Sequence, residues 1–286
     1  MVGQYGTLVH ADDGWLVRRD GRYLALGASL SDLLEMPLDR ARAVYESAHE
    51  PATAPERVRP PVDLQEVWAA GVTYQRSREG RREESGHAAL YDAVYSSDRP
   101  ELFFKATPAR VVGDGAAVGI RADSGWDVPE AEVALVVNST GEIFGYTVGN
   151  DMSSRSIEGE NPLYLPQAKV YTGACALGPA IVPAWEIDGP FDVSVLVERG
   201  DTAVYRASTS TAAMARGFED LVDWLFRALD FPAGVVLLTG TGIVPDRGFT
   251  LRGGDTVTIE IDRIGTLRNS VVVVGRGINN VLTTSR

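Results

Sequence analysis

The segment from Pro129 to Asp151 constrains the fold more than any other part of the chain, because it combines a predicted hairpin with three carboxylates. Val133 to Val137 is apolar and rich in β-branched residues, which predicts a strand from Pro129 onward. Asn138 to Gly141 is typical of a turn, and Ile143 to Val148 is typical of the returning strand. The chain is therefore expected to build an antiparallel hairpin here.

The carboxylates of this hairpin are candidate metal ligands. Side chains alternate along a strand, so Glu130 and Glu132 should point to the same face, ~7 Å apart at Cα. Asp151 follows the returning strand, and the hairpin can bring it back towards both glutamates. Three oxygen ligands without His or Cys suit a hard cation, with Mg2+ expected and Mn2+ or Ca2+ as alternatives. The other interpretation is a solvated acidic face followed by an ordinary Gly-Asn-Asp turn, and spacing alone does not separate the two.

Charge and composition exclude several classes of partner. The net charge of −12 makes nucleic acid and an anionic membrane poor partners, so an anionic substrate needs a local positive field from a metal, Lys or Arg. No apolar run approaches the ~20 residues of a membrane helix, and no signal peptide is recognised at the N-terminus. The single cysteine, Cys175, lies among small apolar residues, which indicates a buried thiol and a reducing, cytoplasmic location.

A proline-rich linker in the sequence predicts two domains. Residues 1–60 form a small leading unit with a hairpin around Ala11 to Gly14 and a capped helical turn from Ser29 to Glu35, and four prolines between Pro51 and Pro61 mark a linker. Residues 61–286 then form a second, larger domain. Many predicted strands and few helices, among them an amphipathic helix over Gly217 to Asp230, give an α+β, β-rich fold class.

Four more side chains are candidates for a site. Glu101 and Lys105 flank buried-looking aromatics on a short predicted strand, although both can be ordinary charges at strand ends. Lys169 precedes a core-like stretch, and a buried lysine is paired or functional. Thr241 stands in a glycine-rich turn and can donate to a substrate carboxylate, or can simply belong to the turn.

Taken together, these segments resemble the fumarylacetoacetate hydrolase superfamily from about Glu66 to Val274. The resemblance implies a mixed β-roll catalytic domain, a homodimer or dimer of dimers, and Mg2+ on Glu130, Glu132 and Asp151, with Lys169 near the substrate. The motifs that carry it are Phe103-Phe104-Lys105, Glu130-x-Glu132, Gly145 to Arg155, Lys169, Gly178-Pro179, Leu251 with Gly254-Asp255, and Ile264-Gly265.

One departure from the hydrolytic members concerns their water-activating His and Glu. The matching positions are Ser77 and Gly80, and a serine is not a general base near neutral pH without a partner. A closer resemblance is to the 2-keto-3-deoxy-D-arabinonate dehydratase branch, which also lacks that pair. It rests on Tyr91 to Pro108, Trp126 to Glu132 and Glu160 to Gln167, and it implies proton transfer by Glu101.

The resulting hypothesis is a Mg2+-dependent dehydratase of a 2-keto-3-deoxy pentonate that yields 2,5-dioxopentanoate. Glu101 is the expected base, Lys169 is expected to hold the anion, and Thr241 and Lys105 are expected to bind substrate. The alternatives are a hydrolase of acylpyruvates or fumarylpyruvate, and a non-catalytic protein that binds a sugar acid on the same fold.

Overall fold

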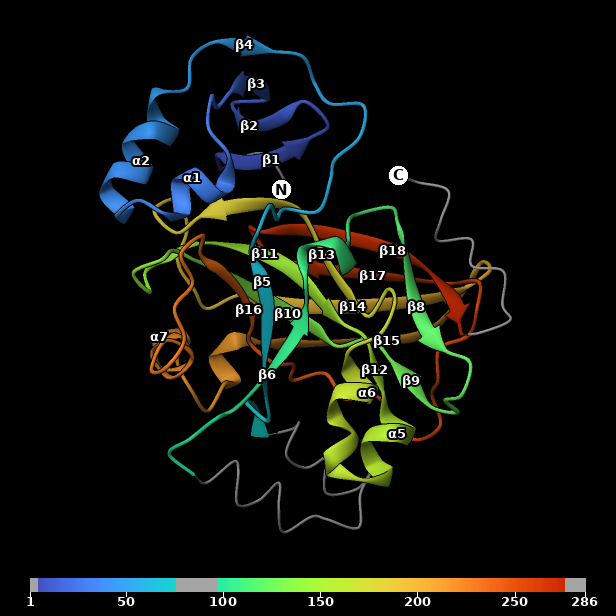
Figure 1. The fold of residues 1–286 in the computed structure, drawn as a ribbon. Coiled ribbons are helices and arrows are strands. Elements are labelled where there is room, and N and C mark those ends of the chain that lie inside the picture. Colours follow the sequence, from blue (N-terminus) through green and yellow to red (C-terminus); the bar gives the residue numbers. More distant parts are fainter. Residues whose placement is uncertain (1–4, 76–96, 276–286) are drawn as a thin grey trace.

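Two large β-sheets packed on each other dominate the fold (Figure 1). The computed structural model describes residues 5–75 and 97–275. Within these residues the strand order of the first sheet is β4-β3-β2-β1-β13-β11-β10-β16-β5-β6, and that of the second is β15-β14-β17-β18-β8. Both sheets contain parallel and antiparallel pairs, so the predicted mixed, β-rich fold is confirmed.

The N-terminal unit, residues 5–60, supplies one end of the first sheet. The capped turn predicted at Ser29 is confirmed, because its hydroxyl accepts a hydrogen bond from the Asp32 N–H and the Asp32 carboxylate accepts one from the Ser29 N–H. The elements are β1 (Thr7–Ala11), β2 (Gly14–Arg19), β3 (Arg22–Ala25), α1 (Leu30–Leu34), α2 (Leu38–Ser47) and β4 (Pro51–Ala52).

This unit shares an apolar core with the rest of the chain. Leu8 and Leu33 of the unit belong to one buried cluster with Ala134 and Leu177 of the central strands. In addition, β1 pairs with the central strand β13 (Cys175–Pro183) at Leu8 and Ile181. The division at residue 60 stays a prediction, and the two parts pack on one core.

The predicted hairpin is confirmed and lies in the middle of the first sheet. It consists of β10 (Ala131–Val137) and β11 (Ile143–Asp151), and every residue of β10 is buried. The neighbouring strands are β5 (Glu66–Gly71), β6 (Glu101–Ala106) and β16 (Val235–Leu238), with β7 (Val111–Val112) beside β13. Parallel pairing of β5 with β16 joins segments far apart in the sequence.

The second sheet covers one face of this hairpin. Val133 and Val148 from the first sheet share a buried core with Val195, Ile259 and Val271 from the second. The strands of the second sheet are β8 (Ala117–Arg121), β14 (Asp192–Arg199), β15 (Thr202–Ser210), β17 (Asp255–Ile261) and β18 (Gly265–Val274).

The amphipathic helix is shorter than predicted. Helix α7 (Phe218–Leu225) buries Leu221 and Leu225, whereas Leu229, placed on its apolar face by the sequence, is 39% exposed. The helix ends at Phe226, whose ring packs against Phe231 at 5.2 Å between centroids. The last predicted turn of the helix is therefore absent, and Phe226 packs against Phe231 just beyond the end of the helix.

Short elements complete the chain near the open end of the hairpin. They are η1 (Pro108–Arg110), β9 (Asp127–Val128), β12 (Ser153–Ser154), α5 (Arg155–Glu160), η2 (Pro162–Tyr164), α6 (Leu165–Lys169) and η3 (Thr211–Ala213). Among residues 5–75 and 97–275, no helix is both long and apolar enough to cross a membrane.

Candidate active site

The three carboxylates predicted as metal ligands lie together. One oxygen each from Glu130, Glu132 and Asp151 lies within 4.8 Å of the others, and all three residues are buried. The hairpin explains the arrangement, because Glu132 pairs with Gly149 and the Asp151 N–H donates to the Glu130 carbonyl at 3.0 Å. Buried carboxylates need compensating positive charge, so the group has the chemistry of a divalent cation site.

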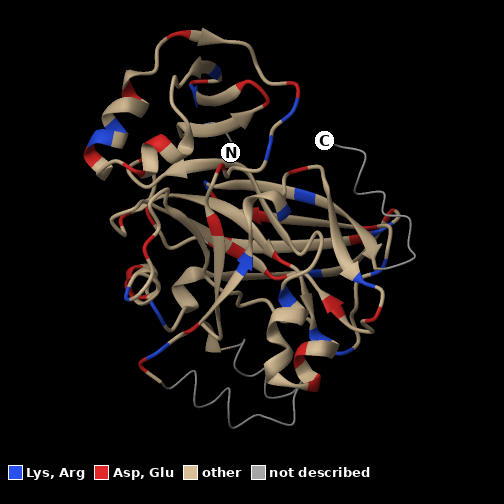
Figure 2. Cartoon of the chain, in the orientation of Figure 1, with Lys and Arg blue, Asp and Glu red and all other residues tan. Residues whose placement is uncertain are grey.

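Three buried cations surround these carboxylates (Figure 2 colours both kinds of charge). The Lys169 Nζ, at the end of α6, donates to Glu130 Oε2 at 2.7 Å, to Asp151 Oδ2 at 2.9 Å and to Ser153 Oγ at 2.6 Å. Arg155 donates to Glu130 Oε1 at 2.6 Å. Lys105 forms an ion pair with Asp151. The expectation that Lys169 is buried is confirmed, at 1% exposure.

Glu132 is the carboxylate whose surroundings most favour an added cation. Burial, followed by the negative charges of Asp151 and Glu130, raises the pKa of Glu132 well above its usual range. Its Oε2 accepts a hydrogen bond from the Gly240 N–H at 2.6 Å. Gly240 has φ +86°, and a Cβ there would lie 2.1 Å from the Thr73 Oγ1, so this close donor requires glycine.

A small cavity opens onto this cluster. Two carboxylates, two cations and one aromatic side chain face it, together with backbone from three strands' ends. The described residues that line it are Ala70, Gly71, Val72, Phe103, Glu130, Asp151, Arg155, Lys169, Gly240 and Thr241. The cavity therefore joins the sequence-predicted residues Glu130, Asp151, Lys169 and Thr241.

Glu101 packs against Gly71, a residue of the cavity wall. The two residues pair across β5 and β6, and a Cβ placed on Gly71 would lie 2.0 Å from the Glu101 Oε2. The described residues that line the cavity include Gly71 but not Glu101 itself. The predicted base therefore lies next to the cavity, and its role stays a prediction.

Thr241 and Lys105 differ in their access to that cavity. Thr241 lines it, and its hydroxyl accepts a hydrogen bond from the Ile243 N–H at 3.1 Å. Lys105 is 1% exposed, and the described residues that line the cavity do not include it. Its ammonium forms an ion pair with Asp151, and substrate contact by Lys105 stays a prediction.

The sequence interpretation assigned no role to three residues of the site. Arg155 and Ser153 follow Asp151 by four and two positions, and Gly240 precedes Thr241. Arg155 could have been predicted as a residue of the site, because it is basic and lies close in the sequence to a predicted metal ligand. The contacts of Gly240 with Glu132 depend on residues 108 positions apart, for which the sequence carries no signal.

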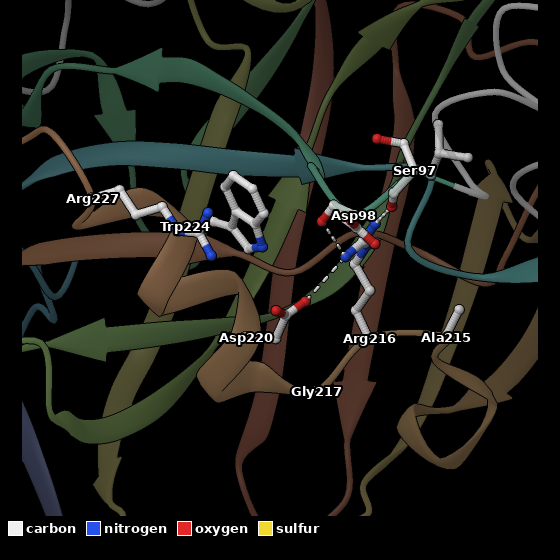
Figure 3. Close-up of a pocket in the computed structure, with 9 residues that line it drawn as sticks. Ser97, Asp98, Ala215, Arg216, Gly217, Asp220, Trp224 and Arg227 are labelled. Atoms are coloured by element: carbon white, nitrogen blue, oxygen red, sulfur yellow. Dashed lines mark hydrogen bonds and ion pairs between the residues drawn. The ribbon is translucent and has the colours of Figure 1, made fainter.

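A larger cavity, about 710 Å³, lies next to α7 (Figure 3). Its two cations, Arg216 and Arg227, are matched by Asp98 and Asp220, and Arg216 donates to the Asp220 carboxylate at 3.1 Å and to the Asp98 carbonyl at 3.0 Å. Of its described lining residues, only Val72 also lines the smaller cavity. Only the smaller cavity, among the cavities of the described residues, is lined by members of the carboxylate cluster, so it is the candidate active site.

A buried carboxylate cluster at the end of a hairpin in a mixed β-sheet, beside the lysine of α6, defines a site of the metal-dependent enzyme class. Residues 67–272 match the family model described as fumarylacetoacetate (FAA) hydrolase C-terminal. The chain therefore belongs to the fumarylacetoacetate hydrolase family, as the sequence motifs predicted. Ser77 and Gly80, which stand where hydrolytic members are expected to carry His and Glu, lie outside the described residues.

The similar proteins include named dehydratases. The chain is 52% identical over 216 residues to a probable 2-keto-3-deoxyxylonate dehydratase of Haloferax volcanii, covering 75% of this chain and 74% of that protein. It is 40% identical over 273 residues to a 2-dehydro-3-deoxy-D-arabinonate dehydratase of Saccharolobus solfataricus, covering 93% and 92%. A solved 2-keto-3-deoxy-D-arabinonate dehydratase complexed with magnesium and 2,5-dioxopentanoate gives a TM-score of 0.82 at 34% identity, covering 94% of this chain and 99% of that one.

Proposed function

We propose that the protein is a magnesium-dependent dehydratase that converts a 2-keto-3-deoxy pentonate into 2,5-dioxopentanoate. The observation that carries the proposal is the buried cluster of Glu130, Glu132 and Asp151, whose cavity is also lined by Lys169 and by Gly71, against which Glu101 packs. The names of the dehydratase relatives, and the magnesium and 2,5-dioxopentanoate in one solved neighbour, support the same reaction.

Glu130, Glu132 and Asp151 would hold the magnesium ion. Bound there, the ion supplies Lewis acidity towards the oxygens of a 2-oxo acid, which makes a C3 proton easier to remove. Mn2+ and Ca2+ accept the same kind of oxygen ligands and remain alternatives. Lys169 and Arg155, both at the cavity, provide the positive field that an anionic substrate needs in a chain of net charge −12.

The remaining chemistry belongs to side chains at the cavity wall. Glu101 removes the C3 proton, the C4 hydroxyl leaves, and the proton and hydroxide together make the water that is lost. The product of this elimination is a 3,4-unsaturated 2-oxo acid that still carries the C5 hydroxyl. Loss of a C5 proton and gain of a proton at C3 give the C4–C5 enol, which tautomerises to the semialdehyde. Lys169 holds the substrate anion or the developing enolate, and the Thr241 hydroxyl binds the substrate carboxylate. A positioned carboxylate base contributes ~100- to 10,000-fold to such a step.

Hydrolysis of a carbon–carbon bond is the alternative reaction in this family. It requires an activated water, and Ser77 and Gly80 do not supply a base or its partner. A purely binding protein is the other alternative, but it has no need of a carboxylate at the position of Glu101. The site composition thus favours dehydration over both.

Product analysis separates these functions. The protein with Mg2+ is incubated with both C4 epimers of 2-keto-3-deoxypentonate, whose only stereocentre is C4, and with acylpyruvates. Semialdehyde formed from a pentonate is expected. Pyruvate released from acylpyruvates without any semialdehyde would replace the proposal with hydrolysis, and no product from either would leave a binding protein.

A Glu101→Gln variant tests the base. Turnover should fall by ~100- to 10,000-fold while Mg2+ binding, measured by calorimetry, stays as in the wild type. Near-full activity in this variant would show that Glu101 is not the base.

We also propose that the protein works as a homodimer, or a dimer of dimers, in the cytoplasm. The family resemblance supports the assembly, and the one cysteine, which is buried, suits a reducing compartment. Light scattering on the purified protein measures the assembly, and a monomer at micromolar concentration would contradict it.

A further inference from the structure

Strand β6 carries Glu101, Phe103 and Lys105 at every second position. Glu101 and Phe103 lie on one face, as alternation along a strand predicts: Glu101 packs against Gly71, Phe103 lines the cavity, and the Lys169 Nζ is 5.6 Å from the Phe103 ring centroid. The pairing with β5 is irregular at Lys105, so the contacts of this side chain, rather than alternation, show where it lies.

The Lys105 ammonium contacts groups that support the cavity rather than its lining. It donates to the Met152 carbonyl at 3.0 Å and to the Lys169 carbonyl, and it forms an ion pair with the Asp151 carboxylate. Lys105 is 1% exposed, and the described residues that line the cavity do not include it. These three contacts, and not the cavity, therefore define its surroundings.

Each of these acceptors belongs to the catalytic machinery or its immediate support. The Lys169 carbonyl is one of the last carbonyls of α6, which have no partner within the helix and attract a cation. Asp151 turns one oxygen to Lys105 and the other to Lys169. A single buried ammonium thus holds the metal-ligand candidate and the backbone that carries the catalytic lysine.

We infer that Lys105 is a positioning residue that aligns Asp151 and Lys169 with Glu101, which stands on the same strand. The inference rests on the proposed function, in which Asp151 binds the metal and Glu101 removes the proton. Strand β6 then sets the spacing between base, metal ligand and catalytic lysine.

A positioning role and a simple charge-balancing role predict opposite effects on metal binding. If Lys105 only balanced charge, its removal would make the site more negative and would tighten Mg2+ binding. If it orients Asp151, its removal weakens Mg2+ binding, and loss of such a supporting partner typically costs about 10- to 100-fold in metal affinity. The sign of the change therefore tests the inference.

The experiment titrates the full-length protein with MgCl2 in a calorimeter without substrate. Lys105→Met removes the ammonium and keeps an aliphatic side chain, and Lys105→Arg keeps the charge on a planar group that does not match the three acceptors. Arg121→Met is the matched control, because Arg121 also donates to a carbonyl of α6, that of Gln167 at 3.2 Å, but forms its ion pair with Asp123 and not with the cluster. Thermal unfolding records the stability of each variant.

Both Lys105 variants should bind Mg2+ about 10- to 100-fold more weakly than the wild type, as is typical when a partner that supports a metal ligand is lost. The Mg2+ affinity of Arg121→Met should stay within about threefold of the wild-type value, because Arg121 supports no metal ligand. In steady-state assays the Lys105 variants should lose kcat at saturating Mg2+ with a smaller change in KM, since a positioning residue does not touch the substrate. If Lys105→Met does not fold, Lys105→Arg decides.

Wild-type or tighter Mg2+ affinity in a folded Lys105 variant would overturn the inference. A wild-type protein that binds no Mg2+ would instead overturn the proposed function. The two failures are therefore distinguishable in the same titration.

Discussion

A methyl group added at Gly71 should displace the candidate base without removing it. The added Cβ would lie 2.0 Å from the Glu101 Oε2 and 2.6 Å from its Cδ, whereas an ordinary contact begins at 3.4 Å. Because the clash is with the far end of a flexible side chain, we expect the backbone to stay in place and the carboxylate oxygen to move by at least 1.4 Å, the difference between those distances.

A displacement of that size is large for a proton transfer. A misplacement of about 1 Å can lower a rate by ~100-fold, which corresponds to about 2.7 kcal/mol in the activation free energy. Gly71→Ala should therefore lower kcat for semialdehyde formation by about two orders of magnitude. Its Mg2+ affinity should stay close to that of the wild type, since Gly71 contacts Glu101 and not the carboxylate cluster.

A double-mutant cycle shows whether the effect acts through Glu101. Semialdehyde formation is measured for Gly71→Ala, Glu101→Ala and the double variant, each checked for its unfolding midpoint. The double variant should be no slower than Glu101→Ala alone, because the displaced group is already missing. Additive losses, or a Gly71→Ala variant within twofold of wild-type kcat, would refute the reasoning.

Three further outcomes follow from the site and its surroundings. Glu132→Ala should require far more Mg2+ for half-maximal activity, and an unchanged Mg2+ dependence would remove Glu132 from the ligands. Gly240→Ala should lower the free energy of unfolding by about 1–3 kcal/mol, because the residue has φ +86° and no room for a Cβ; an unchanged urea midpoint would contradict this. Burial raises the pKa of Asp127 from 3.8 to about 6, so the folded state holds a proton that the unfolded state has lost. The stability that this residue contributes should therefore fall as pH rises from about 4 to 6. In Asp127→Asn the urea midpoint should depend less on pH across that range. An equal pH dependence of the urea midpoint in the two proteins would rule out the effect.

The local parts of the site could be predicted from the sequence because they depend on local patterns. β-branched runs on either side of a turn give the hairpin, and the hairpin alone brings Glu130, Glu132 and Asp151 together. The resemblance gave Glu101 and Lys169 their expected roles, and in the structure Lys169 lines the cavity while Glu101 packs against Gly71 of its wall.

The packing behind the cavity could not be predicted, because it joins residues distant in sequence. Lys105 donates to carbonyls 47 and 64 positions away in the sequence. Nothing in the residues next to it in the sequence distinguishes a buried structural lysine from one that binds substrate. The early end of α7 has a similar cause, since a contact between Phe226 and Phe231 overrides the apolar periodicity that extends to Leu229.

The place of β13 between the first hairpin and the Asp151 strand makes the leading residues hard to remove. A fragment that begins after residue 60 would lose β1 from one side of β13, and without Leu8 and Leu33 it would expose Ala134 and Leu177 to water. An unpaired strand edge beside newly exposed apolar residues promotes strand pairing between molecules. Such a truncated enzyme should precipitate on expression even though every residue of its cavity is still encoded.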